Sequence, residues 1–214
     1  MVEAKHGFVS KSEHWGGLGR MSYVGLREIT SAEEGHLGGN IREGDPFTYS
    51  PRAWDYVLDR FAIRSILDLG SGLGYSSQYF FQKGRQVIAV DGLVENCAAA
   101  VYPTLKHDLN SGPVFCSVDL VHCQEVVEHI EEQYLDHVLA SLACGKFVLV
   151  THAMPGQGGH HHVNLKPPEY WRSNMARFEC EVMEEDTKRL RKLAQADGAS
   201  YLASTGLLFA NKRR

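Results

Sequence analysis

From residue 65 onward, short apolar runs of strand length alternate along this chain with segments whose apolar residues have helical spacing. Short apolar runs of strand length predict buried strands over 65–69, 86–90, 119–123 and 147–150. The segments between these runs have the length and spacing of helices and predict them over 75–83, 94–100 and 131–143. Strands and helices in this order form βαβ units with right-handed crossovers, so the pattern predicts an α/β fold with a parallel sheet.

Further elements flank this alternation. Pro51 opens a predicted helix over 52–61, whose apolar residues follow the spacing i, i+3, i+4 and i+7. A charged helix over 184–196 and an apolar strand over 206–210 close the chain.

The first 50 residues differ from the rest because they are rich in glycine and follow neither spacing. Glycine permits unusual backbone angles and close approach of the chain to other groups. We therefore interpret 1–50 as an irregular lid with short helical pieces over the domain formed by 51–214. A flexible leader without a role is the alternative. The residues behind this interpretation are Gly16, Gly17, Gly19, Gly38, Gly39 and Gly44, with His14, Trp15, His36 and Tyr49.

The composition is typical of a soluble globular protein, with 43% hydrophobic and 22% charged residues. Lys and Arg number 22 and Asp and Glu 26, so the formal net charge of −4 gives no global attraction to nucleic acid or to an anionic membrane. The longest apolar stretch, 142–150, is interrupted by Lys146 and is far shorter than a spanning helix of about 20 residues. The N-terminus lacks the apolar segment of a secretory signal, and five cysteines without a CxxC pair are typical of reduced thiols. We therefore expect a cytoplasmic protein without a membrane partner.

A glycine-rich loop joins the first predicted strand to the first predicted helix, where a doubly wound sheet presents its ligand crevice. The loop reads Asp68-Leu69-Gly70-Ser71-Gly72-Leu73-Gly74, an acidic residue followed by three alternating glycines. The dinucleotide fingerprint GxGxxG needs glycine where this chain has Tyr75, and no Gly-Lys-Ser/Thr follows to make a P-loop. A carboxylate beside the loop would repel a pyrophosphate, but it suits a ligand with an ammonium group.

Asp91 is a second acidic residue at a strand end, 19 residues beyond Gly72. A carboxylate at this place can accept hydrogen bonds from both hydroxyls of a ribose. An amine-bearing nucleoside without a phosphate satisfies both acidic positions, and S-adenosylmethionine is that molecule. Plain turn chemistry and a solvated strand end are the alternatives. The residues predicted from these two motifs to bind this cofactor are Asp68, Gly70, Ser71, Gly72, Asp91 and Gly92.

Over 65–209 the chain resembles the class I S-adenosylmethionine-dependent methyltransferases. The motifs that carry the resemblance are 68–74, Val90-Asp91-Gly92, His107-Asp108-Leu109 and Cys123-Gln124-Glu125-Val126-Val127-Glu128-His129. The resemblance implies a doubly wound, mostly parallel, seven-stranded Rossmann-like sheet and methyl transfer as the activity. It also implies that the glycine loop holds the methionine part of the cofactor and that Asp108 and Leu109 meet the adenine. Gln124 and Glu125 would then face the transferred methyl group. The segment 151–164 is similar to a bacterial and viral branch of the superfamily.

Carboxylates and histidines cluster after the predicted strand 119–123. If this segment is helical, Glu125, Glu128 and His129 share one face. The loop after the predicted strand 147–150 adds four more histidines, His152, His160, His161 and His162. We predict that His129 and His161 are catalytic, with His161 reaching the acceptor as a general base. A metal site made of Glu125, Glu128, His129 and His161 is the alternative, which is similar to the metal-dependent small-RNA 2′-O-methyltransferases. We do not expect a divalent metal.

The sequence therefore predicts an S-adenosylmethionine-dependent methyltransferase that acts on oxygen or nitrogen of a small-molecule or glycan-precursor acceptor. The alternatives are a metal-assisted RNA 2′-O-methyltransferase and a non-catalytic nucleoside-binding subunit. The segment after the predicted strand 119–123 lacks the Asn/Asp-Pro-Pro-aromatic motif of enzymes that methylate base amines. The basic runs 188–192 and 212–214 are interpreted as solvated surface, because acidic residues accompany the first run at helical spacing. Nucleic acid is therefore disfavoured as a partner.

Overall fold

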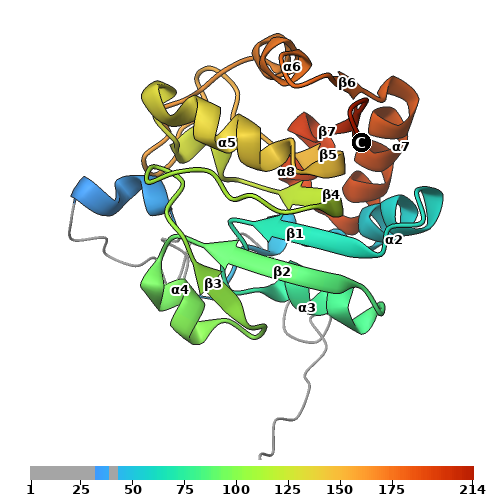
Figure 1. Ribbon diagram of the computed structural model, residues 1–214, viewed down its shortest axis with the longest axis horizontal. Coiled ribbons are helices and arrows are strands. Elements are labelled where there is room, and N and C mark those ends of the chain that lie inside the picture. The colour runs from blue at the N-terminus through green and yellow to red at the C-terminus, as the bar shows by residue number, and fades with distance from the viewer. Residues whose placement is uncertain (1–31, 39–42) are drawn as a thin grey trace, which may run out of the picture.

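One mixed sheet organises the protein, whose computed structural model describes residues 32–38 and 43–214 (Figure 1). Its strands lie in the order β3-β2-β1-β4-β5-β7-β6. They are β1 (Ser65–Leu69), β2 (Gln86–Asp91), β3 (Thr104–Lys106), β4 (Val118–Cys123), β5 (Gly145–Val150), β6 (Cys180–Val182) and β7 (Leu207–Asn211). Neighbouring strands from β3 to β5 pair in parallel, and β7 is antiparallel to both β5 and β6. The Rossmann-like, seven-stranded and mostly parallel sheet implied by the resemblance is confirmed.

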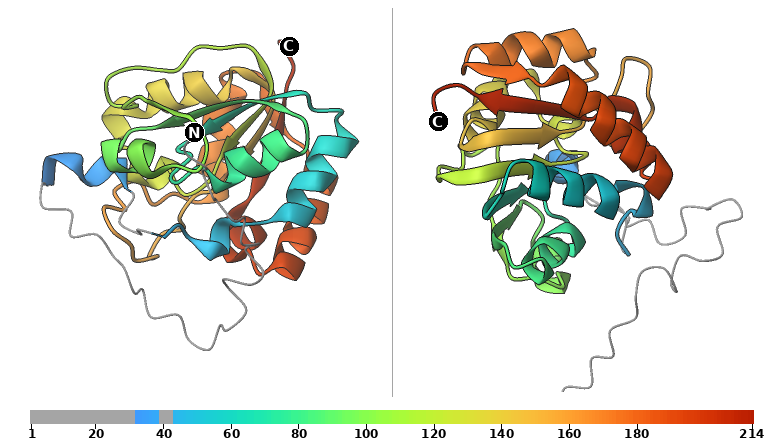
Figure 2. Two further views of the ribbon diagram at one scale, coloured as in Figure 1. Left: turned by 90° about the horizontal axis from the view of Figure 1, so that it is seen from below. Right: turned by 90° about the vertical axis from the view of Figure 1, so that its right-hand side faces the viewer.

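Helices cover both faces of this sheet (Figures 1 and 2). The α-helices are α2 (Pro51–Arg60), α3 (Tyr75–Gln82), α4 (Val94–Ala99), α5 (Leu135–Leu142), α6 (Pro168–Ala176), α7 (Glu184–Asp197) and α8 (Ser200–Thr205). The described residues also form four short 3-10 helices, η1 (Ala32–Leu37), η2 (Pro46–Thr48), η3 (Val127–His129) and η4 (Glu132–Tyr134). Within the described ranges, no helix combines the length and the apolar character that a membrane crossing requires.

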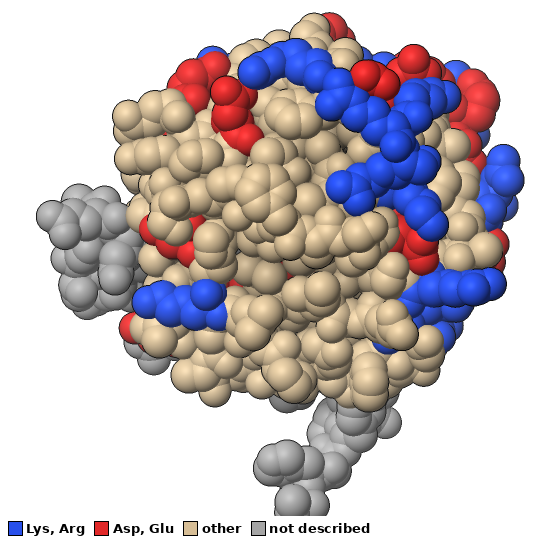
Figure 3. Space-filling view, viewed as in Figure 1, with Lys and Arg blue, Asp and Glu red and all other residues tan. Residues whose placement is uncertain are grey.

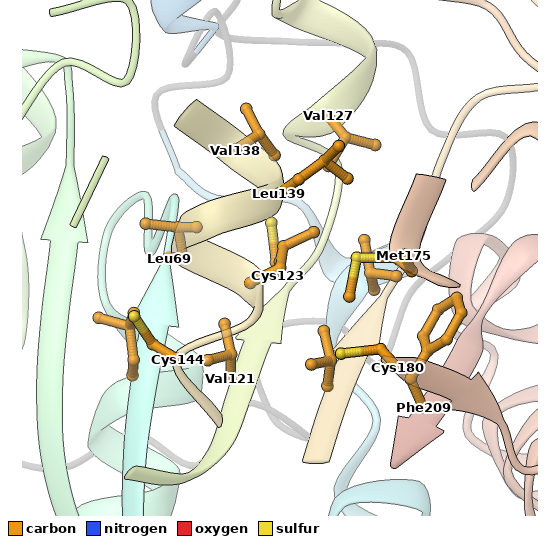
Figure 4. Close-up of a cluster of buried hydrophobic side chains, with 14 of the residues drawn as sticks. Leu69, Val121, Cys123, Val127, Val138, Leu139, Cys144, Met175, Cys180 and Phe209 are labelled. Atoms are coloured by element: carbon orange, nitrogen blue, oxygen red, sulfur yellow. The ribbon is translucent and has the colours of Figure 1, made fainter. Parts of the chain in front are cut away.

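Successive residues of the central strands point to opposite faces, so each face has its own hydrophobic core. On one face, Leu69 of β1 packs with Leu139 of α5 and Met175 of α6 (Figure 4). On the other face, Ile66 of β1 packs with Leu58 of α2, and α2 lies beside α7 (Figure 2). Burial on both faces explains why the central strands are nearly continuous apolar runs in the sequence.

Most predicted elements are confirmed to within one or two residues, and the differences occur at the edges of the sheet. The predicted strand 65–69 is β1 and the predicted helix 131–143 is the pair η4 and α5. β3, β6 and α8 were not predicted. β3 and β6 have three residues each and form the two edges of the sheet, where the hydrophobic pattern is short and weak.

Lysine and arginine side chains gather near the C-terminus on the face shown in Figure 3, whereas the lower part of that face carries few charges. Lys212 lies 3.3 Å from Glu181, and Arg213 lies 2.8 Å from Glu179. Asn211, which precedes them, donates to the carbonyl of Gly145 at 3.2 Å, so the basic run 212–214 lies near the start of β5. The ion pairs support the interpretation of the run 212–214 as solvated surface. All five cysteines are free thiols, as predicted.

Candidate active site

A cavity of about 220 Å³ lies at the edge of the sheet where β1, β2 and β4 end. The loops after these three strands line it, together with residues 36–38 and 44–49 from the N-terminal segment. The structure brings all ten predicted cofactor-binding residues to this wall: Asp68, Gly70, Ser71, Gly72, Asp91, Gly92, Asp108, Leu109, Gln124 and Glu125.

Backbone hydrogen bonds hold the glycine loop against the end of β2. The amides of Gly70 and Ser71 both donate to the carbonyl of Val90, at 2.8 and 2.9 Å. Gly70 has a φ of 72° and Gly72 a φ of 56°, in a region that residues with side chains rarely adopt. A Cβ at Gly70 would also lie 2.2 Å from Cγ2 of Val126, so glycine is required for the contact between this loop and the loop after β4.

The cavity wall beside the glycine loop has open space and buried polar atoms that lack hydrogen-bond partners among the described residues. A Cβ at Gly72 would meet no other atom within 4 Å. Ser71 Oγ and both side-chain amide atoms of Gln124 are buried and have no hydrogen-bond partner among the described residues. Because buried polar groups are normally hydrogen-bonded, this wall fits a polar ligand that contacts the loops after β1 and β4.

Asp91 is only 5% exposed and accepts three hydrogen bonds from the chain itself. Gly72 N donates to Oδ2 at 2.8 Å, and Leu93 N and Asn96 Nδ2 donate to Oδ1 at 2.9 and 3.1 Å. Burial raises the pKa of Asp91, and these hydrogen bonds act against the rise. An ionised carboxylate has about four acceptor sites, so Asp91 retains capacity for about one ribose hydroxyl rather than the two that the sequence predicted.

Asp68 is buried in the wall with donors on both of its oxygens. The hydroxyls of Ser76 and Ser77 donate to Oδ2 at 2.6 and 2.5 Å, and His122 Nδ1 lies 2.7 Å from Oδ1. Burial raises the pKa of Asp68, but His122 and the two hydroxyls outweigh burial and hold the pKa below its ordinary value. Asp68 therefore joins β1, α3 and β4, and its predicted contact with an ammonium group stays a prediction.

The described part of the N-terminal segment contacts the side of the cavity formed by the loops after β2 and β3. His36 Nε2 lies 3.1 Å from each carboxylate oxygen of Asp108. Leu37 packs on Gly92 so closely that a Cβ there would lie 2.6 Å from Leu37 Cδ2. These contacts place residues 36–37 over the predicted adenosine site. The other predicted lid residues His14, Trp15, Gly16, Gly17, Gly19 and Gly39 lie outside the described residues.

Two acidic side chains lie together at the end of β4. Glu125 has a φ of 55°, its amide donates to Thr151 Oγ1, and that hydroxyl donates back to Glu125 Oε1, both at 2.8 Å. Burial is the main cause that raises the pKa of Glu125 to about 7. Glu128 is fully buried, and neither of its oxygens has a hydrogen-bond partner among the described residues. Burial and the charge of Glu125 raise the pKa of Glu128 well above its ordinary value, so this pair retains a proton near neutral pH.

His129 lines the cavity, as predicted. Burial and three neighbouring histidines lower its pKa to about 3, and its ring meets that of His162 edge-on with centroids 5.0 Å apart. A base with so low a pKa takes up a proton poorly near neutral pH. The position of His129 therefore suits contact with a ligand better than proton transfer.

The prediction for His161 is corrected by the structure, because none of the four loop histidines is among the described residues that line the cavity. His161 Nε2 instead faces Glu131 Oε1 at 3.9 Å. His152 points into the core beside Trp171, with ring centroids 6.0 Å apart.

The described residues contain no group of three or more His, Cys, Asp or Glu side chains that is arranged to hold a metal ion. The candidate set Glu125, Glu128, His129 and His161 is therefore not assembled there. The cause is local conformation, since the shared face required a helix over this segment and the structure has only the single 3-10 turn η3. Glu125 precedes that turn in a left-handed conformation and does not share a helical face with Glu128.

Sequence reasoning missed several residues that shape the site. Their contacts span long sequence separations, as between Glu125 and Thr151 or between Asp68 and His122. A signal existed for His122, a polar residue inside a predicted buried strand, which the register places directly opposite Asp68. The residues missed are Asp45, Asn96, His122 and Thr151.

Comparisons with known proteins agree with this geometry. Residues 67–144 match the family model described as a methyltransferase domain. The chain therefore contains an S-adenosylmethionine-dependent methyltransferase domain. No curated protein matches its sequence significantly.

Solved structures share the fold at low sequence identity. A sugar N-methyltransferase from Streptoalloteichus sp ATCC 53650 has a TM-score of 0.54 and 16% identity, over 78% of this chain and 91% of that one. Human N-acetylserotonin methyltransferase, in complex with S-adenosylmethionine, has a TM-score of 0.53 and 14% identity, over 75% of this chain and 51% of that one. Magnesium protoporphyrin IX methyltransferase from Synechocystis PCC 6803, with bound S-adenosylhomocysteine, has a TM-score of 0.51 and 16% identity, over 61% and 70%. These similarities concern the fold and do not identify the acceptor or the branch of the family.

Proposed function

We propose that this chain transfers the methyl group of S-adenosylmethionine to an oxygen or nitrogen atom of a small molecule or glycan precursor. The observation that carries the proposal is the wall of one cavity. There the open position at Gly72, the unpartnered Ser71 hydroxyl and the unpartnered Gln124 amide lie with the carboxylates of Asp91 and Asp108. Such a wall fits a ligand with an amine, a ribose and a base but no phosphate.

Each part of the cofactor has residues suited to it. The methionine part would lie along Gly70, Ser71 and Gly72, the ribose at Asp91, and the adenine at Asp108 with Leu109. When bound, the cofactor supplies a methyl group on a positively charged sulfur. The protein has then to hold the acceptor in line with that group and to take up the proton that the acceptor loses.

The N-terminal segment supports a small, enclosed acceptor. His36 and Leu37 lie against Asp108 and Gly92 over the cavity. We propose that 1–50 forms a lid over the domain 51–214, which excludes water and holds both substrates together. His129 lines the same cavity, and we propose that it contacts the acceptor.

Two measurements, made one after the other, test this function. Calorimetry with S-adenosylhomocysteine should show binding, and its absence in a folded protein would exclude the cofactor. Incubation with an isotopically labelled methyl donor and a cell extract should then label the small-molecule fraction. Label in RNA or protein would contradict the proposed acceptor class, and binding without any transfer would favour a non-catalytic nucleoside-binding subunit.

A further inference from the structure

Acidic groups gather at the end of the cavity where the loop after β4 meets the glycine loop. Glu125 and Asp45 line the cavity, and Glu128, which interacts with Glu125, is fully buried. The three are close enough to interact, since the charge of Asp45 acts on Glu125 and that of Glu125 acts on Glu128. Among the described lining residues the basic side chains are histidines, and of these His129 is kept neutral by its pKa of about 3. The end of the cavity after β4 is therefore acidic.

Glu125 is held in place rather than left free to turn away. Its backbone adopts a left-handed φ of 55°, a conformation that residues with a Cβ rarely adopt. Thr151 holds the backbone and the carboxylate together through two hydrogen bonds of 2.8 Å. Conformations of this kind persist where the surrounding structure enforces them, often at functional sites. The position of this carboxylate is therefore part of the architecture of the site.

The burial of Glu128 near the same end of the cavity is unfavourable in free energy. It is fully buried, and both of its oxygens lack a hydrogen-bond donor among the described residues. A buried carboxyl without donors is unfavourable, and a second carboxyl beside it prevents both from ionising together. Glu125 lines the cavity whereas Glu128 does not, so a ligand that brings a positive charge to Glu125 would favour its ionised form.

The location relative to the cofactor follows from the loops. Val126, directly after Glu125, packs on Gly70 so closely that a Cβ at Gly70 would lie 2.2 Å from it. If the glycine loop holds the methionine part, as proposed above, Glu125 lies at the methyl end of the cofactor and the carboxylates Asp91 and Asp108 at its nucleoside end.

We propose that the acceptor is an amine and that Glu125 is the catalytic residue that takes up its proton. The proposal rests on the proposed function. The acceptor ammonium group gives one proton to a Glu125 carboxylate oxygen, and the lone pair so released forms the new carbon–nitrogen bond with the methyl group. The electron pair of the breaking carbon–sulfur bond stays on sulfur. A phosphorylated or carboxylate-bearing acceptor centre would be repelled by the same acids.

Two cofactor analogues test this without knowledge of the acceptor. Sinefungin carries a primary amine where the methyl group is transferred, and S-adenosylhomocysteine carries nothing there. If Glu125 faces that position, calorimetry should show that the protein binds sinefungin about tenfold or more tightly than S-adenosylhomocysteine, as expected for a hydrogen bond between charged groups. Glu125→Gln removes the charge but keeps the shape, and should bring the two affinities to within about threefold.

Two controls localise the effect. Asp108→Asn, at the nucleoside end, should weaken both ligands alike and leave their affinity ratio unchanged. Glu185→Gln, on the exposed surface of α7, should change neither affinity. Thermal melting checks that each variant is folded.

A wild-type ratio near one would overturn the amine acceptor and favour a neutral hydroxyl, and this arm needs no variant to fold. An unchanged preference for sinefungin in folded Glu125→Gln would overturn the role of Glu125. If neither analogue binds the wild-type protein, the proposed function itself fails, and the inference fails with it.

Discussion

Gly72→Val tests the cofactor assignment because it adds a side chain where the structure leaves the cavity open. Gly72 has a φ of 56°, and a Cβ there would meet no other atom within 4 Å. Backbone strain therefore opposes folding without any steric overlap of the Cβ, at about 1–2 kcal/mol for a left-handed residue with a side chain. A chain of this size loses about 2–4 °C of Tm per kcal/mol, so we expect Tm to fall by about 2–8 °C.

Binding should suffer more than stability. The isopropyl group of valine would occupy the space that the methionine part of the cofactor needs. Overpacking of a filled site costs about 1–3 kcal/mol, which corresponds to a loss of affinity for S-adenosylhomocysteine of about 5- to 150-fold. Calorimetry on the folded variant measures this loss directly.

Gly84 provides a matched control. It follows α3 with a φ of 75°, a Cβ there would also meet no atom within 4 Å, and it is not among the residues lining the cavity. Gly84→Val should therefore lower Tm by a similar amount and leave the affinity for S-adenosylhomocysteine unchanged. If both variants melt alike and Gly72→Val binds S-adenosylhomocysteine as the wild type does, the glycine loop does not hold the cofactor.

Three further predictions follow from the site. Asp91→Ala should weaken S-adenosylhomocysteine binding by about 1–3 kcal/mol in calorimetry, because hydrogen bonds to a charged group are lost; unchanged affinity would place the ribose elsewhere. Burial raises the pKa of Glu128 and that of Glu125, the latter from 4.5 to about 7, so the folded state binds more protons than the unfolded state and stability falls as pH rises through this range. Glu128→Gln should flatten that fall in Tm and raise Tm above about pH 7, and an unaltered pH dependence would contradict the burial argument. Removal of 1–45 should leave a cooperatively melting core that binds S-adenosylhomocysteine more weakly, because the contact with Asp108 is lost; full affinity would show that the segment is dispensable.

The central sheet could be predicted because each of its strands carries its own signal. β1, β2, β4 and β5 are strands of five or six residues bounded by turns, and the last three residues of each are buried. β3 lacks such a signal, since it has three residues at the edge of the sheet and its Leu105 is 63% exposed. Pairing with β2 alone makes it a strand, and a partner strand is not visible in a local pattern.

The same distinction applies to the site. The glycine loop and Asp91 lie at the ends of adjacent parallel strands, and the order of βαβ units alone places them together. Contacts that depend on register or on a distant segment were missed. His36 and Asp108 are 72 residues apart, and no periodicity in either segment connects them.

The histidine loop shows how a correct location can accompany a wrong orientation. The sequence placed this loop at the right edge of the sheet, and His162 does reach the ring of His129. The end of the loop is fixed by its backbone, because the amides of Val163 and Asn164 both donate to the carbonyl of Glu128 at 3.0 Å. His161 then adopts a φ of 49°, and its ring lies against Gly35 of η1 and faces Glu131 rather than lining the cavity. The number of histidines in the loop gives no information about these backbone hydrogen bonds. We therefore propose Glu125, which the loop after β4 holds in the cavity wall, as the general base that the sequence analysis assigned to the histidine loop.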